Sequence, residues 1–360
     1  MKAAVIVGTR PELIKMAVLI KVLKSLDPHH LFIHSGQHYD YSMDGAVLDT
    51  FHLQQPDYHL KVGSGSHAST TAKILTGVEE IIQREKIDLV IVHGDTNTTL
   101  GGTLAAAKLN VKIAHVEAGL RSYDRSMPEE INRVLVDHIA QYLFTPTQQA
   151  GENLAKEGIV NGVYQTGQTI VDAVHFIKSH VQSTKLLQAF NLQPKSYFFV
   201  TVHRQENTDN PLRLSSIVKA LDRVAKEGPE KVVLSLHPRT KQKLIENNLY
   251  ERLKTNEAII LIDPPTNFVN ALLLQRDAKG ILTDSGGIQE EACIIGTPCI
   301  TLRLNTERPE TVECGANQLA GFETQSILQC VESIRTNQAN WKHPYGNHGV
   351  SQKILDILFS

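Results

Sequence analysis

The chain alternates short apolar runs with longer stretches in which apolar residues recur at helical spacing. The first half contains apolar runs bounded by polar residues or glycine at 3–7, 31–33 and 89–92, and a further predicted strand at 111–116. Such runs are typical of strands buried on both faces. Apolar residues at every third or fourth position predict helices after Pro11, at 70–84, at 100–109 and after Pro128. This alternation predicts a parallel sheet with helices on both faces.

The same pattern occurs a second time after a polar interruption at 179–196. It resumes with apolar runs at 197–202, 232–236, 258–262, 280–283 and 298–302. A chain of 360 residues is long enough for two domains of ordinary size. We therefore predict an α/β protein with two doubly wound parallel-sheet domains, at 1–170 and 171–345, and a linker near 167–195. The last segment, 346–360, carries a helix that we expect to cross back to the first domain.

Composition and charge narrow the class of protein further. The apolar fraction of 41% suffices for full cores, and a net charge of −2 gives no support to a nucleic-acid partner. The 4 cysteines form no C-x-x-C pair, which favours free thiols in a reducing compartment. The sequence starts directly with an apolar strand, and no apolar run reaches the length of a membrane span. We therefore expect a cytoplasmic protein without a signal peptide, a membrane partner or a nucleic-acid partner.

Charged and polar residues gather just after the predicted strands, where open parallel sheets bind their ligands. In the first domain these are Arg10, Lys15, Asp95, Glu117 and Glu129, and in the second they are His203, His237, the turn Ser285–Gly287 and Arg308. We expect the two sets to face one interdomain cleft, in which the second domain holds an anion and the first supplies carboxylates and a lysine. That layout suits an enzyme acting on a nucleotide sugar. The alternative is that Asp95 and Glu117 are helix caps and that His203 is structural.

The stretch 280–291 combines a strand, a turn and the start of a helix. Its apolar run is followed by the sequence DSGG at 284–287 and then by apolar residues at helical spacing. A helix N-terminus presents free backbone N–H groups and the positive end of the helix dipole, so it binds anions. The glycines let a phosphate approach the backbone, and the glutamates at 290–291 offer acceptors for a ribose. The alternative is a plain helix with Asp284 or Ser285 as its N-cap.

No cofactor fingerprint accompanies these residues. The first turn, Gly8–Glu12, lacks the G-x-G-x-x-G pattern of dinucleotide binding, and no G-x-x-x-x-G-K-[ST] loop occurs. His93 with Asp95, and His115 with Glu117, share strand faces, so a metal site is an alternative reading of these residues. The usual metal-ligand spacings are absent from the sequence. We expect neither a metal nor another cofactor.

Six motifs together resemble the non-hydrolysing UDP-N-acetylglucosamine 2-epimerases over nearly the whole chain. They are GTRPE at 8–12, GDTN at 94–97, HVEAGLR at 115–121, PEEINR at 128–133, DSGGIQEE at 284–291 and TERPE at 306–310. The resemblance implies a GT-B fold with two Rossmann-like domains, an interdomain cleft and a closing hinge. It also implies a homodimer and the interconversion of UDP-GlcNAc and UDP-ManNAc in polysaccharide biosynthesis.

The resemblance assigns roles to the residues at matching positions. Asp95, Glu117 and Glu129 match the family's catalytic acids, and His203 matches its active-site histidine. The matching substrate contacts are Ser285, Gly286, Gly287 and Glu291 for UDP, Arg308 for the diphosphate or sugar, and Arg10 and Lys15 from the first domain. The implied reaction removes the C2 proton and releases UDP to give a 2-acetamidoglucal. UDP then re-adds while a proton reaches the other face of C2, which needs two acid–base groups and no redox cofactor.

Two stretches depart from the pattern of many bacterial members. Residues 36–40 read GQHYD where those members carry QHRE, and 203–206 read HRQE where they have a second arginine. Both changes leave open whether a second substrate molecule activates the enzyme. They also resemble relatives acting on UDP-2,3-diacetamido-uronic acids, the nearest alternative, whereas TERPE favours UDP-GlcNAc. A GT-B glycosyltransferase is a further alternative, although its acceptor site needs no set of three carboxylates.

Overall fold

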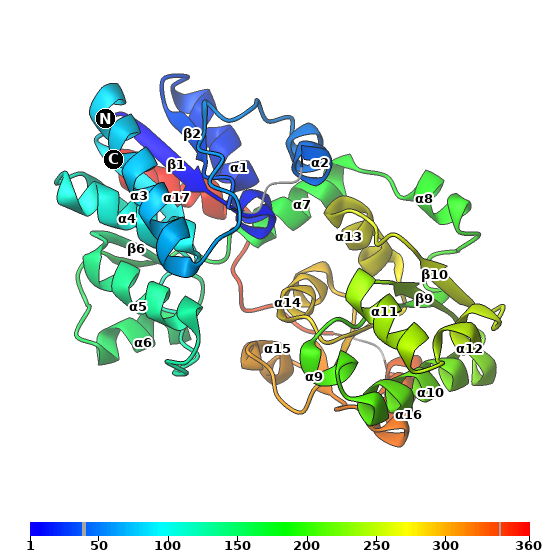
Figure 1. Cartoon of the computed structure of the whole chain (residues 1–360). Coiled ribbons are helices and arrows are strands. Elements are labelled where there is room, and N and C mark those ends of the chain that lie inside the picture. Colours follow the sequence, from blue (N-terminus) through cyan, green and yellow to red (C-terminus); the bar gives the residue numbers. More distant parts are fainter. Residues whose placement is uncertain (38–40, 338–339) are drawn as a thin grey trace. The chain divides into compact units, whose positions relative to one another are not determined.

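The computed structural model describes residues 1–37, 41–337 and 340–360 (Figure 1). Most of the variant stretch at 36–40 therefore lies outside the described residues. The chain divides into two compact units, one formed by Met1–Ile177 with Tyr345–Ser360 and the other by Lys178–Pro344. The division falls inside helix α7 (Ile170–His180), and helix α8 (Thr184–Ala189) follows it. The segment that we predicted as a linker therefore consists largely of helix.

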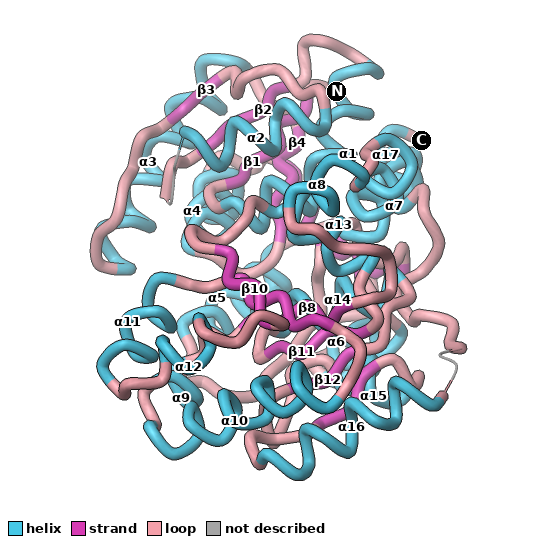
Figure 2. The backbone as a smooth tube through the Cα atoms, turned by 90° about the vertical axis from the view of Figure 1, so that its right-hand side faces the viewer, coloured by secondary structure: helices cyan, strands magenta, loops and turns pink. Residues whose placement is uncertain are grey.

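The first unit is built on a parallel sheet. Within the described residues this sheet has seven strands in the order β3-β2-β1-β4-β5-β6-β7. The strands are β1 (Ala3–Val7), β2 (Leu31–His34), β3 (Tyr58–His59), β4 (Leu89–His93), β5 (Lys112–Val116), β6 (Tyr142–Thr145) and β7 (Val163–Gln165). Every residue of β1, β2 and β4 is buried, because helices lie on both sides of these strands (Figure 2).

The helices of the first unit connect successive strands, and the C-terminal helix returns to pack against α1. The carboxylate of Asp172 fixes the start of this last helix, since it accepts hydrogen bonds of 2.6 to 3.2 Å from the N–H groups of Gly349, Val350 and Ser351. The helices besides α7 are α1 (Arg10–Leu26), α2 (Tyr41–Phe51), α3 (His67–Glu85), α4 (Asn97–Lys108), α5 (Pro128–Ile139), α6 (Gln148–Lys156) and α17 (Val350–Phe359).

The second unit has the same architecture as the first, a parallel sheet with connecting helices. Its described residues form a six-stranded parallel sheet in the order β10-β9-β8-β11-β12-β13. The strands are β8 (Tyr197–Thr201), β9 (Lys231–Ser235), β10 (Ile259–Ile262), β11 (Gly280–Thr283), β12 (Cys299–Thr301) and β13 (Asn317–Leu319). The helices besides α8 are α9 (Gln205–Thr208), α10 (Pro211–Glu227), α11 (Pro238–Glu246), α12 (Tyr250–Lys254), α13 (Phe268–Asp277), α14 (Gly286–Ile295), α15 (Pro309–Glu313) and α16 (Thr324–Thr336).

The two sheets confirm the prediction of a doubly wound α/β protein with two Rossmann-like units. In each, the strand order reverses beside the first strand of the unit, between β1 and β4 and between β8 and β11. Ligands of open α/β sheets bind beyond the carboxyl ends of the strands at such a reversal. Of the predicted site residues, Asp95, His203 and Ser285 lie just after such strands. Among the described helices, none combines the length and the apolar character needed to cross a membrane.

Candidate active site

The turn after β1 is held by the buried carboxylate of Glu12, which we did not predict as a site residue. One of its oxygens accepts hydrogen bonds from the N–H groups of Gly8 and Thr9 at 2.9 and 2.8 Å. The other accepts from the hydroxyls of Thr96 and Thr99, after β4, at 2.7 and 3.2 Å. Burial raises the pKa of Glu12, an effect that these hydrogen bonds oppose. Glu12 therefore ties the carboxyl ends of β1 and β4 together.

Glu117 is the centre of a compact cluster beyond these strand ends. It lies directly after β5 with a left-handed φ of 71°, and 7% of the residue is exposed. Its carboxylate forms an ion pair with Lys15 of α1 and accepts a hydrogen bond of 2.7 Å from Gln168 Nε2. His93 Nε2 lies 3.4 Å from the same oxygen. Such a φ is strained for a non-glycine residue, so these contacts must hold the carboxylate in place.

The two predicted residues Lys15 and Glu117 are thus in direct contact. Arg10 is the first residue of the same helix, α1, and is partly exposed. The contribution of Gln168 was not predicted, because it belongs to none of the recognised motifs and reaches Glu117 across 51 residues of sequence. His93 directly precedes the motif GDTN, and this position is the sequence feature that indicates a place for His93 near the site.

Asp95 contacts a different partner, Arg133 of α5, with which it forms an ion pair. Arg133 also lies 2.8 Å from Glu130. Burial would raise the pKa of Glu130, but hydrogen bonds to its carboxylate and the charge of Arg133 outweigh burial and lower it. Thr96 is the N-cap of α4, since its hydroxyl accepts from the N–H groups of the first helical turn. The alternative reading of Asp95 as a helix cap is therefore wrong.

Glu129 is exposed at the second position of α5. It makes no hydrogen bond or ion pair within the part of the chain that the structure describes. Because it lies one helical turn before Arg133, the two side chains leave the same face of α5. The structure thus pairs Asp95 with Arg133 and places Glu117 in a separate cluster with Lys15, while Glu129 belongs to neither group.

His115 has a structural role in the motif HVEAGLR. Its Nε2 donates to the Gly94 carbonyl at 2.8 Å, and its Nδ1 lies 2.7 Å from Asp137. Asp137 also accepts a hydrogen bond of 2.6 Å from Arg121, which holds Glu157 through two further bonds of 2.7 Å. The described residues contain no group of three or more His, Cys, Asp or Glu side chains arranged to hold a metal ion.

In the second unit, Asp284 is fully buried and reaches back to the neighbouring strand. Its carboxylate accepts hydrogen bonds of 3.0 Å from the backbone nitrogens of His203 and Arg204, and one of 3.1 Å from Asn207. Asp284 therefore fixes the turn after β8 to the turn after β11. The alternative reading of this acid as the N-cap of α14 is wrong, because Ser285 occupies that position without a side-chain cap.

The start of α14 is accessible at only one of its two glycines, since Gly286 is buried and Gly287 is exposed. A Cβ added to Gly286 would lie 3.5 Å from Glu307 Oε2, and one added to Gly287 would lie 3.9 Å from Glu291 Oε1 and Ser285 Oγ. These are ordinary contacts, so packing alone does not demand either glycine. The first N–H groups of a helix have no partner within the helix. The exposed Gly287, which carries no side chain, leaves room for an anion to approach these groups.

The acids one turn into α14 have defined partners. Glu291 is partly exposed and accepts a hydrogen bond of 2.7 Å from Gln275. Glu290 is buried, and its carboxylate lies 3.8 Å from Nε of Arg308. Of the two, Glu291 is therefore the acid with an accessible carboxylate. Glu290 instead forms an ion pair with Arg308, whose side chain is 19% exposed.

His203 stands beside the turn that Asp284 fixes. Its ring centroid lies 6.0 Å from that of His237, and its Nε2 lies 3.8 Å from Asp284 Oδ1. Burial lowers the pKa of His203, while the charge of Asp284 opposes that shift. The side chain is 37% exposed, so its ring remains accessible to a ligand.

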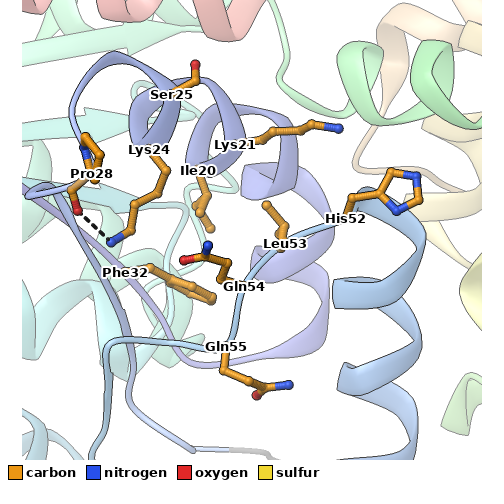
Figure 3. Close-up of a pocket in the computed structure, with 10 residues that line it drawn as sticks. All are labelled: Ile20, Lys21, Lys24, Ser25, Pro28, Phe32, His52, Leu53, Gln54 and Gln55. Atoms are coloured by element: carbon orange, nitrogen blue, oxygen red, sulfur yellow. Dashed lines mark hydrogen bonds between the residues drawn. The ribbon is translucent and has the colours of Figure 1, made fainter.

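A pocket of about 270 Å³ lies elsewhere in the first unit (Figure 3). It is lined by the second half of α1, by Phe32 at the start of β2 and by the segment 52–55. Lys24, which points into this region, donates to the Pro28 carbonyl at 3.3 Å and to Asp57 at 3.0 Å. These elements lie toward the amino ends of the strands, so the pocket contains none of the predicted site residues.

Comparisons with known proteins agree with the motifs. A family model described as UDP-N-acetylglucosamine 2-epimerase matches residues 23–359. The chain is 46% identical to the UDP-N-acetylglucosamine 2-epimerase of Methanocaldococcus jannaschii, over 99% of both chains. It is 40% identical to the UDP-2,3-diacetamido-2,3-dideoxy-D-glucuronate 2-epimerase of Pseudomonas aeruginosa, again over 99% of both. The fold is similar to the crystal structure of M. jannaschii UDP-GlcNAc 2-epimerase in complex with UDP-GlcNAc and UDP, with a TM-score of 0.85, 46% identity and 99% coverage of each chain.

Proposed function

The chain belongs to the UDP-N-acetylglucosamine 2-epimerase family, and on this premise we propose that it interconverts UDP-GlcNAc and UDP-ManNAc by inverting C2 of the sugar. The observation that carries this proposal is the buried carboxylate of Glu117 beside Lys15. A cation in contact favours the ionised form of a carboxylate, which is the form that removes a proton. A carboxylate at a strand end without a neighbouring cation such as Lys15 would give weaker support to the proposal.

The UDP moiety binds at the turn Ser285–Gly287 in this proposal. The diphosphate meets the N–H groups at the start of α14, where the exposed Gly287 carries no side chain. Glu291 accepts from the ribose hydroxyls, and Arg308 contacts the diphosphate or the sugar. The cation and the N–H groups stabilise the negative charge that UDP gains as it leaves.

The chemistry follows an elimination and re-addition. A base removes the C2 proton, the C1–O bond breaks with its electron pair going to UDP, and a 2-acetamidoglucal forms. UDP then re-adds while a proton reaches the other face of C2. Asp95, Glu117 and Glu129 are the acid–base candidates, with His203 beside the nucleotide. Arg10 and Lys15 supply positive charge from the first unit.

The chain acts as a homodimer in this proposal, with α5 as part of its contact. Met127, Ile131 and Leu135 recur every four residues and are 37%, 48% and 44% exposed, so they form an apolar stripe along one side of this helix. Light scattering of wild type and of Leu135→Asp tests this point. We expect a dimer for wild type and a weakened dimer for the variant; a monomeric wild type contradicts it.

A second substrate class deserves the same assay. The identity of 40% to a UDP-2,3-diacetamido-2,3-dideoxy-D-glucuronate 2-epimerase favours a sugar acid with a second acetamido group as the alternative. A glycosyltransferase is the remaining alternative, and it would require an acceptor.

The deciding experiment is proton NMR of UDP-GlcNAc with the protein in deuterated water, without an acceptor. We expect UDP-ManNAc to appear with deuterium at C2, because the proton that leaves C2 is replaced by one from the solvent. The same assay with the diacetamido-uronic acid substrate separates the two epimerase readings. UDP-GlcNAc that stays unchanged and unlabelled contradicts the proposed function.

A further inference from the structure

His93 has an unusual environment for a buried histidine. It is the last residue of β4, is 3% exposed, and neither ring nitrogen has a hydrogen-bond partner among the described residues. His115, at the matching end of β5, is also fully buried, but both of its ring nitrogens are engaged. Buried polar groups are nearly always hydrogen-bonded, because an unpaired group costs free energy. A purely structural role explains why His115 is buried, but it does not explain why His93 is buried without a hydrogen-bond partner in the part of the chain that the structure describes.

One of these nitrogens faces the central acid of the site. Nε2 of His93 lies 3.4 Å from Oε2 of Glu117, the oxygen that also contacts Lys15 and Gln168. A movement of a few tenths of an ångström brings the two atoms within hydrogen-bond distance. Contacts of catalytic groups are often long in the absence of substrate and tighten when it binds.

We propose that His93 acts through Glu117, by taking up the proton that Glu117 removes from C2 of the sugar in one direction of the reaction and by supplying a proton to Glu117 in the other direction. The inference rests on the proposed function above. The C2–H bond breaks, its electron pair forms the C1=C2 bond, and the pair of the C1–O bond leaves with UDP. The proton goes to the Glu117 carboxylate and from there to the lone pair of His93 Nε2. In the reverse reaction a proton passes from His93 through Glu117 to C2.

The charges around His93 favour this transfer. A protonated Glu117 is neutral and loses its ion pair with Lys15, whereas passing the proton on restores the carboxylate. The resulting imidazolium then has Glu117 on one side. The carboxylate of Glu12, from α1, is close enough for its charge to interact with that of His93. His93 is therefore a positioning residue. It does not touch the substrate, and it sets the charge of Glu117, which does.

The test uses three variants of the full-length protein at neutral pH. His93→Gln keeps an N–H donor at nearly the same place but cannot take a proton, and His93→Leu removes both functions. The matched control is His34→Gln, which changes another buried histidine at the end of β2, a strand that β1 separates from β4. The turnover number, the KM for UDP-GlcNAc, the exchange at C2 and the melting temperature are measured for each.

We expect both His93 variants to lose turnover and C2 exchange by roughly 100- to 10,000-fold, as for a lost acid–base group, with KM within a factor of about three. His34→Gln should keep both rates. Restoration of near-wild-type turnover by His93→Gln overturns the proposal, since a donor alone would then suffice.

A second measurement keeps the proposal testable if the His93 variants fail to fold. Histidine labelled with ¹⁵N in its ring reports the protonation of His93 in the wild-type protein and in Glu117→Gln. We expect the Nε2 signal of His93 to shift between the two, and an unchanged signal overturns the proposal. A wild-type protein that leaves UDP-GlcNAc unchanged overturns the proposed function, and the role of His93 with it.

Discussion

The imidazole rings of His34 and His59 stack at a centroid distance of 5.2 Å and an interplanar angle of 15°. His34 ends β2 and is buried, and its Nδ1 accepts a hydrogen bond of 3.0 Å from the N–H of Gly36. Burial, with a smaller contribution from the charge of His59, lowers the pKa of His34 from its ordinary 6.5 to about 4. Because the lone pair of Nδ1 accepts this hydrogen bond, it cannot also bind a proton.

The first prediction is a loss of stability in mild acid. Because the folded protein binds the proton of His34 less readily than the unfolded chain does, unfolding takes up a proton between pH about 6.5 and about 4. The contribution of His34 is complete above that range and falls by at most about 3 kcal/mol across it. Urea unfolding of wild type and His34→Gln at several pH values measures this effect. Equal pH dependence in the two proteins contradicts it.

The second prediction concerns the start of α14. Gly287→Val places a branched side chain above the N–H groups that we propose to bind the diphosphate, while its Cβ meets only side-chain atoms at 3.9 Å. We expect UDP affinity to fall at least tenfold with the fold retained. Gly151→Val is the matched control, since a Cβ at this helical glycine also meets a side-chain atom at 3.9 Å. Calorimetry with UDP decides, and an unchanged affinity in Gly287→Val excludes this phosphate site.

Much of the fold could be predicted because its strands are apolar along their whole length. β1 and β11 begin and end where their apolar runs do, at Ala3–Val7 and Gly280–Thr283. The short edge strand β3 and the helix α2 were not predicted. Tyr58–His59 is only partly buried, and the sequence of α2 has little helical periodicity. Elements at the rim of a sheet bury less surface and therefore leave a weaker pattern.

The third prediction tests Asp284, whose role depends on contacts that the sequence does not display. Asp284→Ala removes the acceptor for the backbone N–H groups of His203 and Arg204. Buried donors left without a partner cost about 1–3 kcal/mol each, so we expect a loss of about 3 kcal/mol. Asp284→Asn keeps one oxygen and should lose less. Urea unfolding measures both, and a wild-type midpoint for Asp284→Ala would falsify the assigned role.

Contacts between distant parts of the chain also explain which residues of the proposed site the sequence analysis did not identify as site residues. The family resemblance named Lys15 and Glu117, but their ion pair brings together α1 and the end of β5, which are far apart in the chain. Glu12, His93 and Gln168 matter through partners from other elements, and no local spacing records those partners. Asp95 followed a strand and preceded a helix, so a helix cap was a reasonable local interpretation. Thr96, which is the N-cap of α4, decides against it.

The fourth prediction concerns metal ions. The sequence lacks metal-ligand spacings, and the reaction that we propose needs acid–base groups and an anion site only. We expect turnover to survive EDTA followed by dialysis. A loss of activity that one divalent ion restores contradicts this expectation, provided that the chelator alone leaves the melting temperature unchanged.

The fifth prediction compares how much the contacts of Asp95, Glu117 and Glu129 contribute to the stability of the fold. Glu129 is exposed without a partner among the described residues, so Glu129→Gln should leave the melting temperature unchanged. Asp95→Asn should lower it slightly, because its ion pair is partly exposed and such pairs contribute about 1 kcal/mol or less. Glu117→Gln leaves Lys15 without its counter-ion in a mostly buried place and should cost about 3 kcal/mol.

Catalysis should follow a different order from stability. If these acids transfer protons, C2 exchange falls by roughly 100-fold or more in at least two of the three variants, with UDP affinity near that of wild type. Glu157→Gln is the control, since Glu157 pairs with Arg121 outside the proposed site and should affect melting alone. The Glu129 variant is the most informative of the set. Its acid has no structural contact to lose, so a slow but thermally normal Glu129→Gln can be explained only by a direct part in the reaction. Wild-type exchange in all three variants would instead show that the acids are structural, and that the proton at C2 is moved by other groups.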